Sequence, residues 1–383
     1  MERPRLSGDW GGWRETLAEH GIVPRASYLA GFWSNLRGGF EAGTRYEGFA
    51  KWSVEADLET LARWKGGSFE INWYSYHGGQ PSRDLVGLFA SQTLSGNETS
   101  VAVRFYEIYL EQSFRDGRLV LKGGQIAADD DFFASDKADA LLNASFGFLG
   151  LGRALEIAPI YPLAVPGLHL RATSEDRRWE LQLGAYSGDP GEDVPGNFGF
   201  DHAIENGAFL LGEIRVRPSP FGLPGGYAVG VAATTAKLLN FESGGSASGT
   251  YGLFAVMDQL LVEQSAGRPG LGVFAKTYGA PEEDRNLVSW YFDIGLKLTR
   301  PFPGRGEDLF AVGFAHLNFS GDYVDWARDQ GEGVSRSQSI LELTYRFQAT
   351  GWLTLQPDLQ FIFDPHFSRT DAIAIGLRAV IEL

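Results

Sequence analysis

The sequence predicts an all-β fold: a transmembrane antiparallel β-barrel of 16 strands, with a short N-terminal helix and an inward-folded constriction loop. Three observations lead to this prediction. Segments in which apolar and polar side chains alternate recur along the whole chain, and alternate residues of a strand face opposite sides of a sheet. The connections between these segments alternate between short turns and long loops. The polar face of several segments carries carboxylates.

The alternation is clearest in the last segment, Asp371–Leu383. Its odd-numbered residues from Ile373 to Leu383 are all apolar, whereas its other face carries Arg378 and Glu382. The segments 341–348 and 353–361 repeat this pattern. In a soluble sheet the apolar face would be a core, which is the usual explanation for a single hairpin. Repetition through the whole chain instead favours a sheet with lipid on one side and water on the other.

Composition excludes several classes of protein. No Pro/Ser linker or block of charge divides the 383 residues, so we expect one barrel domain, 23–383, after an N-terminal segment, 1–22. The 50 Gly, 27 Phe, 14 Tyr and 10 Trp suit turns, strands and aromatic girdles. The net charge of −15 argues against a nucleic-acid partner, and the absence of Cys excludes disulfides and thiolate metal sites.

Membrane insertion would have to use strands, because no segment reaches 18 uncharged apolar residues. The start, Met1-Glu2-Arg3-Pro4, lacks the apolar core of a signal peptide. We therefore expect either a cytosolic protein or, for the barrel, a bacterial outer-membrane protein whose signal peptide has been removed. We expect no cofactor and no metal.

Taken in order, the chain begins with a helix over Asp9–His20, capped by Asp9 and ended by Gly21. Sixteen strands are predicted to follow, at 24–35, 49–62, 68–76, 102–114, 118–125, 167–173, 178–186, 208–217, 227–238, 251–263, 271–279, 288–299, 309–317, 341–348, 352–363 and 372–383. Tight turns at 65–67, 115–117, 174–177 and 349–351 alternate with long loops at 77–101, 126–166, 187–207 and 318–340. Outer-membrane barrels show this asymmetry, with the short turns on the periplasmic side.

The polar faces predict a lumen filled with water. Glu107 and Glu111 alternate with apolar or aromatic residues such as Tyr106 and Ile108, and unpaired carboxylates in a dry core would each cost several kcal/mol. Aromatic residues near strand ends predict two belts at the membrane interfaces, formed by Trp52, Trp73, Trp179, Trp290, Tyr345 and Trp352.

The loop 126–166 is long enough to suggest a function. It contains the acidic run Asp129-Asp130-Asp131, a predicted short helix from Ser135 to Asn143 with Ser135 as its cap, and the apolar piece Phe146–Leu151. These pieces could fold into the lumen and narrow it. The alternative is a lid packed on the outer rim.

Five stretches are distinctive in combination: Leu6–Gly12 with Arg14, Leu17 and Gly21-Ile22; Glu107–Gln125; Phe133–Gly147; Tyr161-Pro162 with Pro166-Gly167; and Leu355–Phe361 with Asp364-Pro365. Together they resemble the OprB-type carbohydrate-selective porins over nearly the whole chain. The resemblance implies a sixteen-stranded outer-membrane barrel, often a homotrimer, that passes mono- and small oligosaccharides by facilitated diffusion. The sequence departs from the usual outer-membrane pattern by ending on Leu383, where an aromatic residue is expected.

Seven residues are expected to line the pore and contact a sugar, because they lie on the inward face of a strand or in a segment that resembles the family: Glu107, Glu111, Asp131, Asn143, Arg346, Asp358 and Arg378. Carboxylates and amides form hydrogen bonds with hydroxyls, and Arg donates in a fork. Each residue could equally belong to an ordinary charged wall that holds water and pairs with its neighbours.

Other functions compete with sugar diffusion. A porin for polyols or small organic acids, or one without sugar selectivity, would use the same wall chemistry. A soluble sugar-binding β protein would leave many outward apolar faces without a core. A barrel-embedded hydrolase would need a base, but the six histidines lie in no HxxxH or GxSxG context, so we expect surface histidines and no enzyme.

Overall fold

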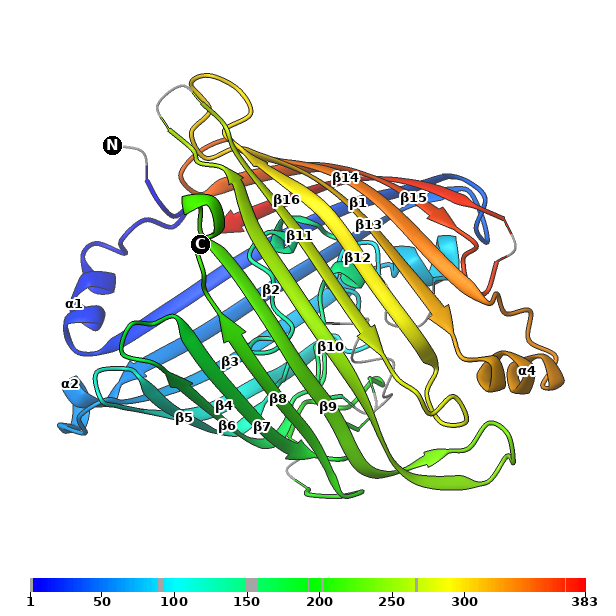
Figure 1. Ribbon diagram of the computed structural model, residues 1–383. Coiled ribbons are helices and arrows are strands. Elements are labelled where there is room, and N and C mark those ends of the chain that lie inside the picture. The colour runs from blue at the N-terminus through cyan, green and yellow to red at the C-terminus, as the bar shows by residue number, and fades with distance from the viewer. Residues whose placement is uncertain are drawn as a thin grey trace.

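The computed structural model describes residues 3–88, 93–148, 158–191, 193–200, 203–265, 268–368 and 370–383. Sixteen antiparallel strands form one closed barrel, in which each strand pairs with its neighbours in sequence and β1 closes against β16 (Figure 1). Closure gives nearly every backbone N–H and C=O of the sheet a partner on an adjacent strand. The predicted fold class is confirmed.

The strands are β1 (Ile22–Arg37), β2 (Gly43–Asp57), β3 (Gly67–Gly78), β4 (Val103–Phe114), β5 (Leu119–Ile126), β6 (Val165–Thr173), β7 (Trp179–Ser187), β8 (Ala208–Val216), β9 (Gly225–Leu239), β10 (Ser246–Val262), β11 (Gly270–Gly279), β12 (Val288–Thr299), β13 (Leu309–Phe319), β14 (Ser337–Gln348), β15 (Leu353–Phe363) and β16 (Ala372–Glu382). Each overlaps a segment predicted from alternation.

The helical elements among the described residues are short and lie outside the sheet: α1 (Trp13–Glu19), α2 (Leu58–Ala62), α4 (Gly321–Asp329), and the single turns η1 (Ser82–Val86), η2 (Ala138–Ala140), η3 (Ala144–Phe146) and η4 (Pro220–Gly222). Within the described ranges, no helix is long and apolar enough to cross a membrane. Figure 1 shows α1, α2 and both termini at one end of the barrel and α4 at the other. The end with the termini and short turns is the periplasmic one by the usual asymmetry of such barrels.

Two predicted boundaries at the periplasmic end are wrong, each for a local reason. Helix α1 begins at Trp13 and not at Asp9, because Gly11 and Gly12 have φ angles of 67° and 94°, outside the helical region. The predicted strand 49–62 ends at Asp57, whose carboxylate accepts a hydrogen bond from the Glu59 backbone N–H at 2.9 Å. This N-cap starts helix α2.

The prediction that Tyr106 lies on the opposite face of its strand from Glu107 is also wrong. The β3–β4 register shifts between the pairs Ile71–Ile108 and Trp73–Phe105, so that Tyr106 and Glu107 together oppose Asn72. One extra residue in a strand reverses the facing of the residues beyond it. Tyr106 and Glu107 are therefore both buried inside the barrel, and Phe105 faces outward.

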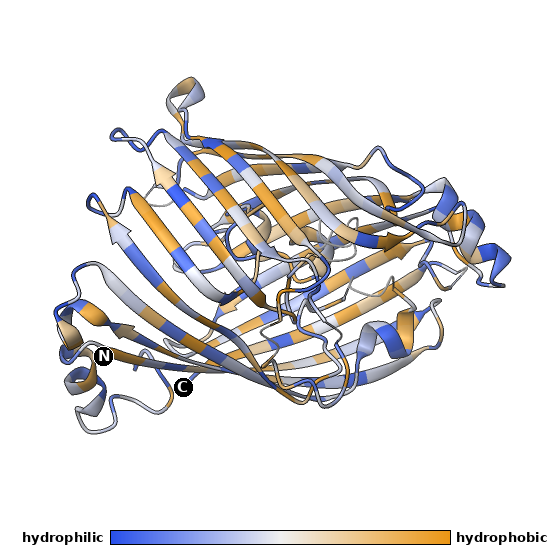
Figure 2. Cartoon of the chain, turned by 90° about the horizontal axis from the view of Figure 1, so that it is seen from below, coloured by the Kyte–Doolittle hydropathy of each residue, from blue (hydrophilic) through white to orange (hydrophobic). Residues whose placement is uncertain are grey.

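The outer surface is apolar, as the alternation predicts; Figure 2 shows apolar and polar residues alternating along the strands. Trp179 follows a short periplasmic turn, Trp290 lies near the start of β12 at the other end of the barrel, and about half of each residue is exposed. Trp52 and Trp73 also face outward and stack with ring centroids 6.1 Å apart. These four predicted belt residues lie outside the lumen, where amphipathic rings suit the membrane interfaces.

Candidate functional site

Two long connections fold into the lumen. One joins β3 to β4 and the other, predicted as the constriction loop, joins β5 to β6. They contact each other: the Ala144 backbone N–H donates to the Thr93 carbonyl at 2.9 Å, and the Tyr161 hydroxyl donates to the Asn97 carbonyl at 2.8 Å. The described part of the β5–β6 loop is therefore not an outer lid. Of its predicted apolar piece, Phe146 and Phe148 are buried, and 149–151 lie outside the described residues.

Carboxylates of the barrel wall hold the backbone N–H groups of the β5–β6 loop. A buried loop has no strand partner for these groups, so side chains must supply the acceptors. The accepting carboxylates lie on four different strands. Glu107 accepts from the N–H of Ala127 (3.1 Å), Glu213 from that of Phe133 (3.0 Å), Asp258 from that of Asp136 (2.9 Å) and Glu342 from that of Asn143 (2.9 Å). Much of the wall's negative charge is thus used to position the loop.

Donors on the wall hold the carbonyls of the same loop. In each contact a wall side chain donates to a backbone carbonyl of the loop: Gln182 to that of Asp131 (3.0 Å), Arg215 to that of Ala134 (2.9 Å), Lys297 to that of Asp136 (2.7 Å), Gln356 to that of Ala140 (2.8 Å), Tyr291 to that of Ser145 (2.6 Å) and Lys276 to that of Gly147 (3.1 Å). Lys276 also forms an ion pair with Asp293. Because the partners come from different sides of the barrel, the loop spans the lumen and narrows it.

The predicted helix from Ser135 to Asn143 is mostly absent. Ser135 does act as a cap, since its hydroxyl accepts from the Ala138 N–H at 3.1 Å. Only Ala138–Ala140 is helical, as one 3-10 turn. The N–H groups of Leu142 and Asn143 bind Glu342, so a wall carboxylate replaces the helical hydrogen bonds there.

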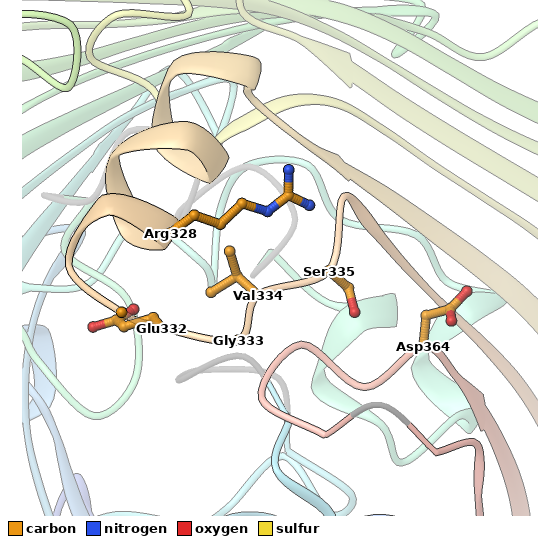
Figure 3. A pocket seen from close by; sticks show the side chains of 7 residues that line it. Arg328, Glu332, Gly333, Val334, Ser335 and Asp364 are labelled. Carbon is orange, nitrogen blue, oxygen red and sulfur yellow. The ribbon is translucent and has the colours of Figure 1, made fainter.

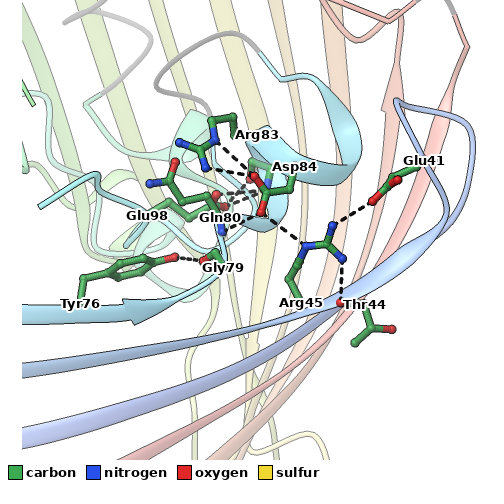
Figure 4. A network of polar contacts seen from close by, with 10 residues as sticks. Glu41, Thr44, Arg45, Tyr76, Gly79, Gln80, Arg83, Asp84 and Glu98 are labelled. Carbon is green, nitrogen blue, oxygen red and sulfur yellow. Dashed lines mark hydrogen bonds and ion pairs between the residues drawn. The ribbon is translucent and has the colours of Figure 1, made fainter. Parts of the chain in front are cut away.

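The β3–β4 loop is fixed by a second set of polar contacts. Glu47 on β2 accepts from Ser95 and from the Trp33 indole, both at 2.9 Å, and Gln360 on β15 donates to the Leu94 carbonyl at 2.8 Å. Figure 4 shows the outer part of this network, where Arg45 joins Asp84 and Glu41 beside Glu98. The sequence-based prediction assigned the constriction to the β5–β6 loop alone, although the length of the β3–β4 connection, 77–101, was the available signal.

A cavity of about 270 Å³ lies between the two loops and the wall, lined by Ser95, Asn97, Asp129, Asn143, Tyr161 and Arg378 among others. Arg378 donates to Gln356 at 2.9 Å, whereas its buried Nε–H has no protein acceptor among the described residues. Asp129 accepts from the Tyr161 N–H at 3.0 Å. Burial, and then the neighbouring Asp130, raises the pKa of Asp129 to about 7. The cavity therefore combines amides, a carboxyl group, a phenol and a guanidinium.

Two of the predicted site residues, Asn143 and Arg378, line this cavity. The amide of Asn143 donates to Gln360 at 2.8 Å, and Gln360 donates to Asp358 at 2.9 Å, so Asp358 supports the cavity from the wall. Glu107 is buried beneath the loop that it holds.

The other three predicted residues lie elsewhere. Asp131 forms an ion pair with Lys122 at 2.6 Å and lines a separate cavity of about 420 Å³ with Arg215 and Asp258. Glu111 and Arg346 are half-buried on the wall, and their side chains form no hydrogen bond or ion pair within the described ranges. The structure thus does not bring these three to the cavity between the loops.

A further cavity of about 540 Å³ opens at the extracellular end, beside α4 (Figure 3). Arg328, Glu332, Ser335 and Asp364 contribute to its lining. None of the predicted site residues belongs to it, so it is a feature of the extracellular loops and not of the constriction.

The expectation of surface histidines is wrong for two of the six. His169 and His366 are buried, with 3% and 0% of their surface exposed. His169 is hydrogen-bonded to the Gln182 amide at 2.9 Å, and His366 to the Tyr323 hydroxyl at 2.9 Å. An amide and a phenol are structural partners here, and neither pair has the serine–histidine arrangement of a hydrolase.

Raising the pH should loosen the β3–β4 loop through Glu98. Burial, and then the nearby Glu47, raises the pKa of Glu98 from 4.5 to about 8. The docked loop therefore holds a proton that an undocked carboxyl would release, so docking is strongest below pH 4.5 and weakens as the pH rises through about 8. Open-channel current fluctuations should increase over this range.

Glu98→Gln is the matched control for this pH dependence, because an amide keeps the shape of the side chain without titrating. Its current fluctuations should change less with pH than those of the wild type. The same pH profile in both proteins would show that another group controls the loop.

Comparisons with known proteins agree with this geometry. A family model described as carbohydrate-selective porin, OprB family, matches residues 41–383. The chain is 27% identical to Porin B of Pseudomonas aeruginosa over 94% of this chain and 87% of that protein. It is 23% identical to the putative porin QuiX of Acinetobacter baylyi over 95% of this chain and 89% of that protein. The high-pH structure of Pseudomonas putida OprB superposes with a TM-score of 0.88 at 24% identity, covering 100% of this chain and 99% of that one.

Proposed function

Since the chain belongs to the OprB family of carbohydrate-selective porins, we propose that it passes mono- and small oligosaccharides across the bacterial outer membrane by facilitated diffusion. The observation that carries this proposal is the cavity between the two loops, which the guanidinium of Arg378, the amide of Asn143 and the aromatic ring of Tyr161 line. Sugar hydroxyls accept and donate hydrogen bonds, and the apolar C–H face of a sugar ring packs against aromatic rings.

Diffusion requires that the site bind weakly. A solute must enter and leave the constriction without an energy source, so its contacts have to compete with water. A typical net hydrogen bond contributes about 0.5–1.5 kcal/mol, and the low end applies where water has access. A few such contacts would orient a sugar without trapping it.

The predicted site residues have different roles in this proposal. Asn143 and Arg378 contact the solute. Glu107 and Asp358 hold the loop or the residues behind the cavity. Asp131, paired with Lys122, lines the separate cavity of about 420 Å³, and Glu111 and Arg346 contribute charge to the hydrated wall. We assign no solute contact to the N-terminal segment 1–22, whose Leu6 and Arg14 instead hydrogen-bond to the carbonyls of Glu382 and Leu383.

Sugar block of ion current through single channels tests the proposal. Arg378→Lys keeps the positive charge near Glu47, Glu342 and Asp358 but removes the guanidinium fork. We expect the affinity for glucose to fall roughly fivefold, which corresponds to about 1 kcal/mol. Arg346→Lys is the matched control, because Arg346 does not line the cavity, and it should leave the block unchanged.

The same recordings separate the competing functions. A sugar-selective pore is blocked by neutral sugars more strongly than by matched polyols or organic acids. Equal block by all three, unaffected by Arg378→Lys, would favour a porin without sugar selectivity. We propose that the protein acts as a channel without catalysis. That it forms a homotrimer stays a prediction, which the mass of the detergent-solubilised protein would test.

A further inference from the structure

The barrel wall is incomplete beside the constriction loop. Strand β4 pairs with β5 only from Ile108–Gln125 to Phe114–Leu119, so residues 103–107 of β4 extend beyond β5. β5 ends at Ile126 because the chain there turns into the lumen. An unpaired sheet edge within the hydrocarbon region leaves N–H and C=O groups without partners, at a cost of several kcal/mol each. The edge of β4 therefore needs a cover.

The β7–β8 loop supplies this cover. The Phe105 N–H donates to the Phe198 carbonyl at 3.0 Å, and the Arg104 guanidinium donates to the Asn197 carbonyl at 3.3 Å. Gly199 lies so close to the edge that a Cβ would be 1.8 Å from the Phe105 carbonyl oxygen. Residues 193–200, which we name the lateral plug, thus bind β4 and bypass β5 and β6.

A carboxylate fixes the other end of the lateral plug. Asp193 accepts from the Thr99 hydroxyl at 2.7 Å and from the Ser100 N–H at 2.9 Å. Both belong to the segment that leads into β4. The plug is therefore attached at one end to the segment that leads into β4 and at the other end to β4 itself.

The outer face of the lateral plug is apolar. Val194, Phe198 and Phe200 have 43%, 60% and 56% of their surface exposed. The Phe200 ring lies 4.6 Å from Phe105, which contacts Trp73 at 6.1 Å. Since Trp73 and Phe105 face outward, Phe200 continues the lipid-facing surface on the outer side of β4.

The strands of the barrel wall are shortest where the plug lies. Strands β5–β8 have 8 or 9 residues, whereas β1, β2, β9 and β10 have 15 to 17. A tilted strand needs about 9–11 residues to cross the hydrocarbon core. The short strands are at or below this limit, so an added apolar layer above β5 and β6 would restore the hydrophobic height.

We propose that the lateral plug completes the barrel wall and that Phe198 and Phe200 contact acyl chains of the outer leaflet. A lipid fits better than a second copy of the chain, for two reasons. The apolar surface is continuous with the lipid-facing band, and three side chains cover far less than the roughly 800 Å² per partner of a stable interface.

Site-directed spin labelling tests this, because the chain has no Cys and each single-Cys variant carries one label. Phe198→Cys and Val194→Cys report on the plug. Leu183→Cys on β7 is the lipid reference, and Asp329→Cys on α4 is the aqueous reference, since both side chains are exposed on their own surfaces. Collision with oxygen and with a water-soluble nickel chelate is measured in phospholipid vesicles.

We expect the oxygen-to-nickel accessibility ratio at 198 to match that at 183 and to be several-fold above that at 329. A ratio at 198 equal to the aqueous reference would overturn the proposal. Dipolar broadening between labels at 198 would show a second copy on the plug and overturn it as well. Val194→Cys gives the same reading if the Phe198 variant does not fold.

Discussion

Removing Ser135–Asn143, with Ala134 joined to Ala144 through a short Gly/Ser linker, should raise single-channel conductance several-fold and admit longer oligosaccharides. The segment is attached to Asp258 on β10, Lys297 on β12 and Gln356 on β15, so it crosses the lumen. A barrel of 16 strands without such a segment encloses a wide aqueous channel. Conductance in planar bilayers and liposome swelling with sugars of increasing length measure both effects.

The matched control for this deletion is the removal of Ser243–Gly245, a turn between β9 and β10 outside the lumen. It shortens the chain without touching the constriction and should leave conductance and size limit unchanged. Equal conductance for the Ser135–Asn143 deletion and the wild type would mean that another part of the chain limits the bore.

Replacing Glu342 by Ala should release the tip of the β5–β6 loop. The carboxylate accepts the N–H groups of Leu142 and Asn143, and Glu342 itself is fully buried. Each buried N–H left without an acceptor costs about 1–3 kcal/mol, so the loss of the acceptor for these two N–H groups should destabilise the docked loop by about 2–6 kcal/mol. Hydrogen exchange at the amides of Leu142 and Asn143 should accelerate at least tenfold, with noisier open-channel currents.

Two variants bracket this effect. Glu342→Gln retains one acceptor oxygen and should give an intermediate acceleration. Glu55→Ala removes a carboxylate that pairs with Arg25 at 2.7 Å, half-exposed and away from the loop, so exchange at Leu142 should stay at the wild-type rate. Protection of Leu142 and Asn143 in Glu342→Ala at the wild-type level would contradict the anchoring role of Glu342.

The number of strands and their lipid-facing sides followed from the sequence because each strand carries its own pattern. In β16, Leu377 is half-exposed outside while Arg378 is directed inside, as the alternation predicts. The pattern failed where backbone geometry intervenes. The extra residue at Tyr106 and Glu107 cannot be recognised from side-chain types, because both residues suit a luminal face.

The sequence by itself determined the barrel, the apolar outer surface and the presence of a long loop rich in acidic and amide residues. Only the tertiary structure decided which polar residues meet. Glu342 and Asn143 are 199 positions apart, and Gln360 reaches both Asn143 and Leu94 across the lumen. The path of a loop depends on which distant wall groups satisfy its backbone, and one-dimensional periodicity carries no information about such pairs. Arg378 and Asn143 therefore lie together at the constriction, whereas Glu111 and Arg346, on equally polar faces, do not.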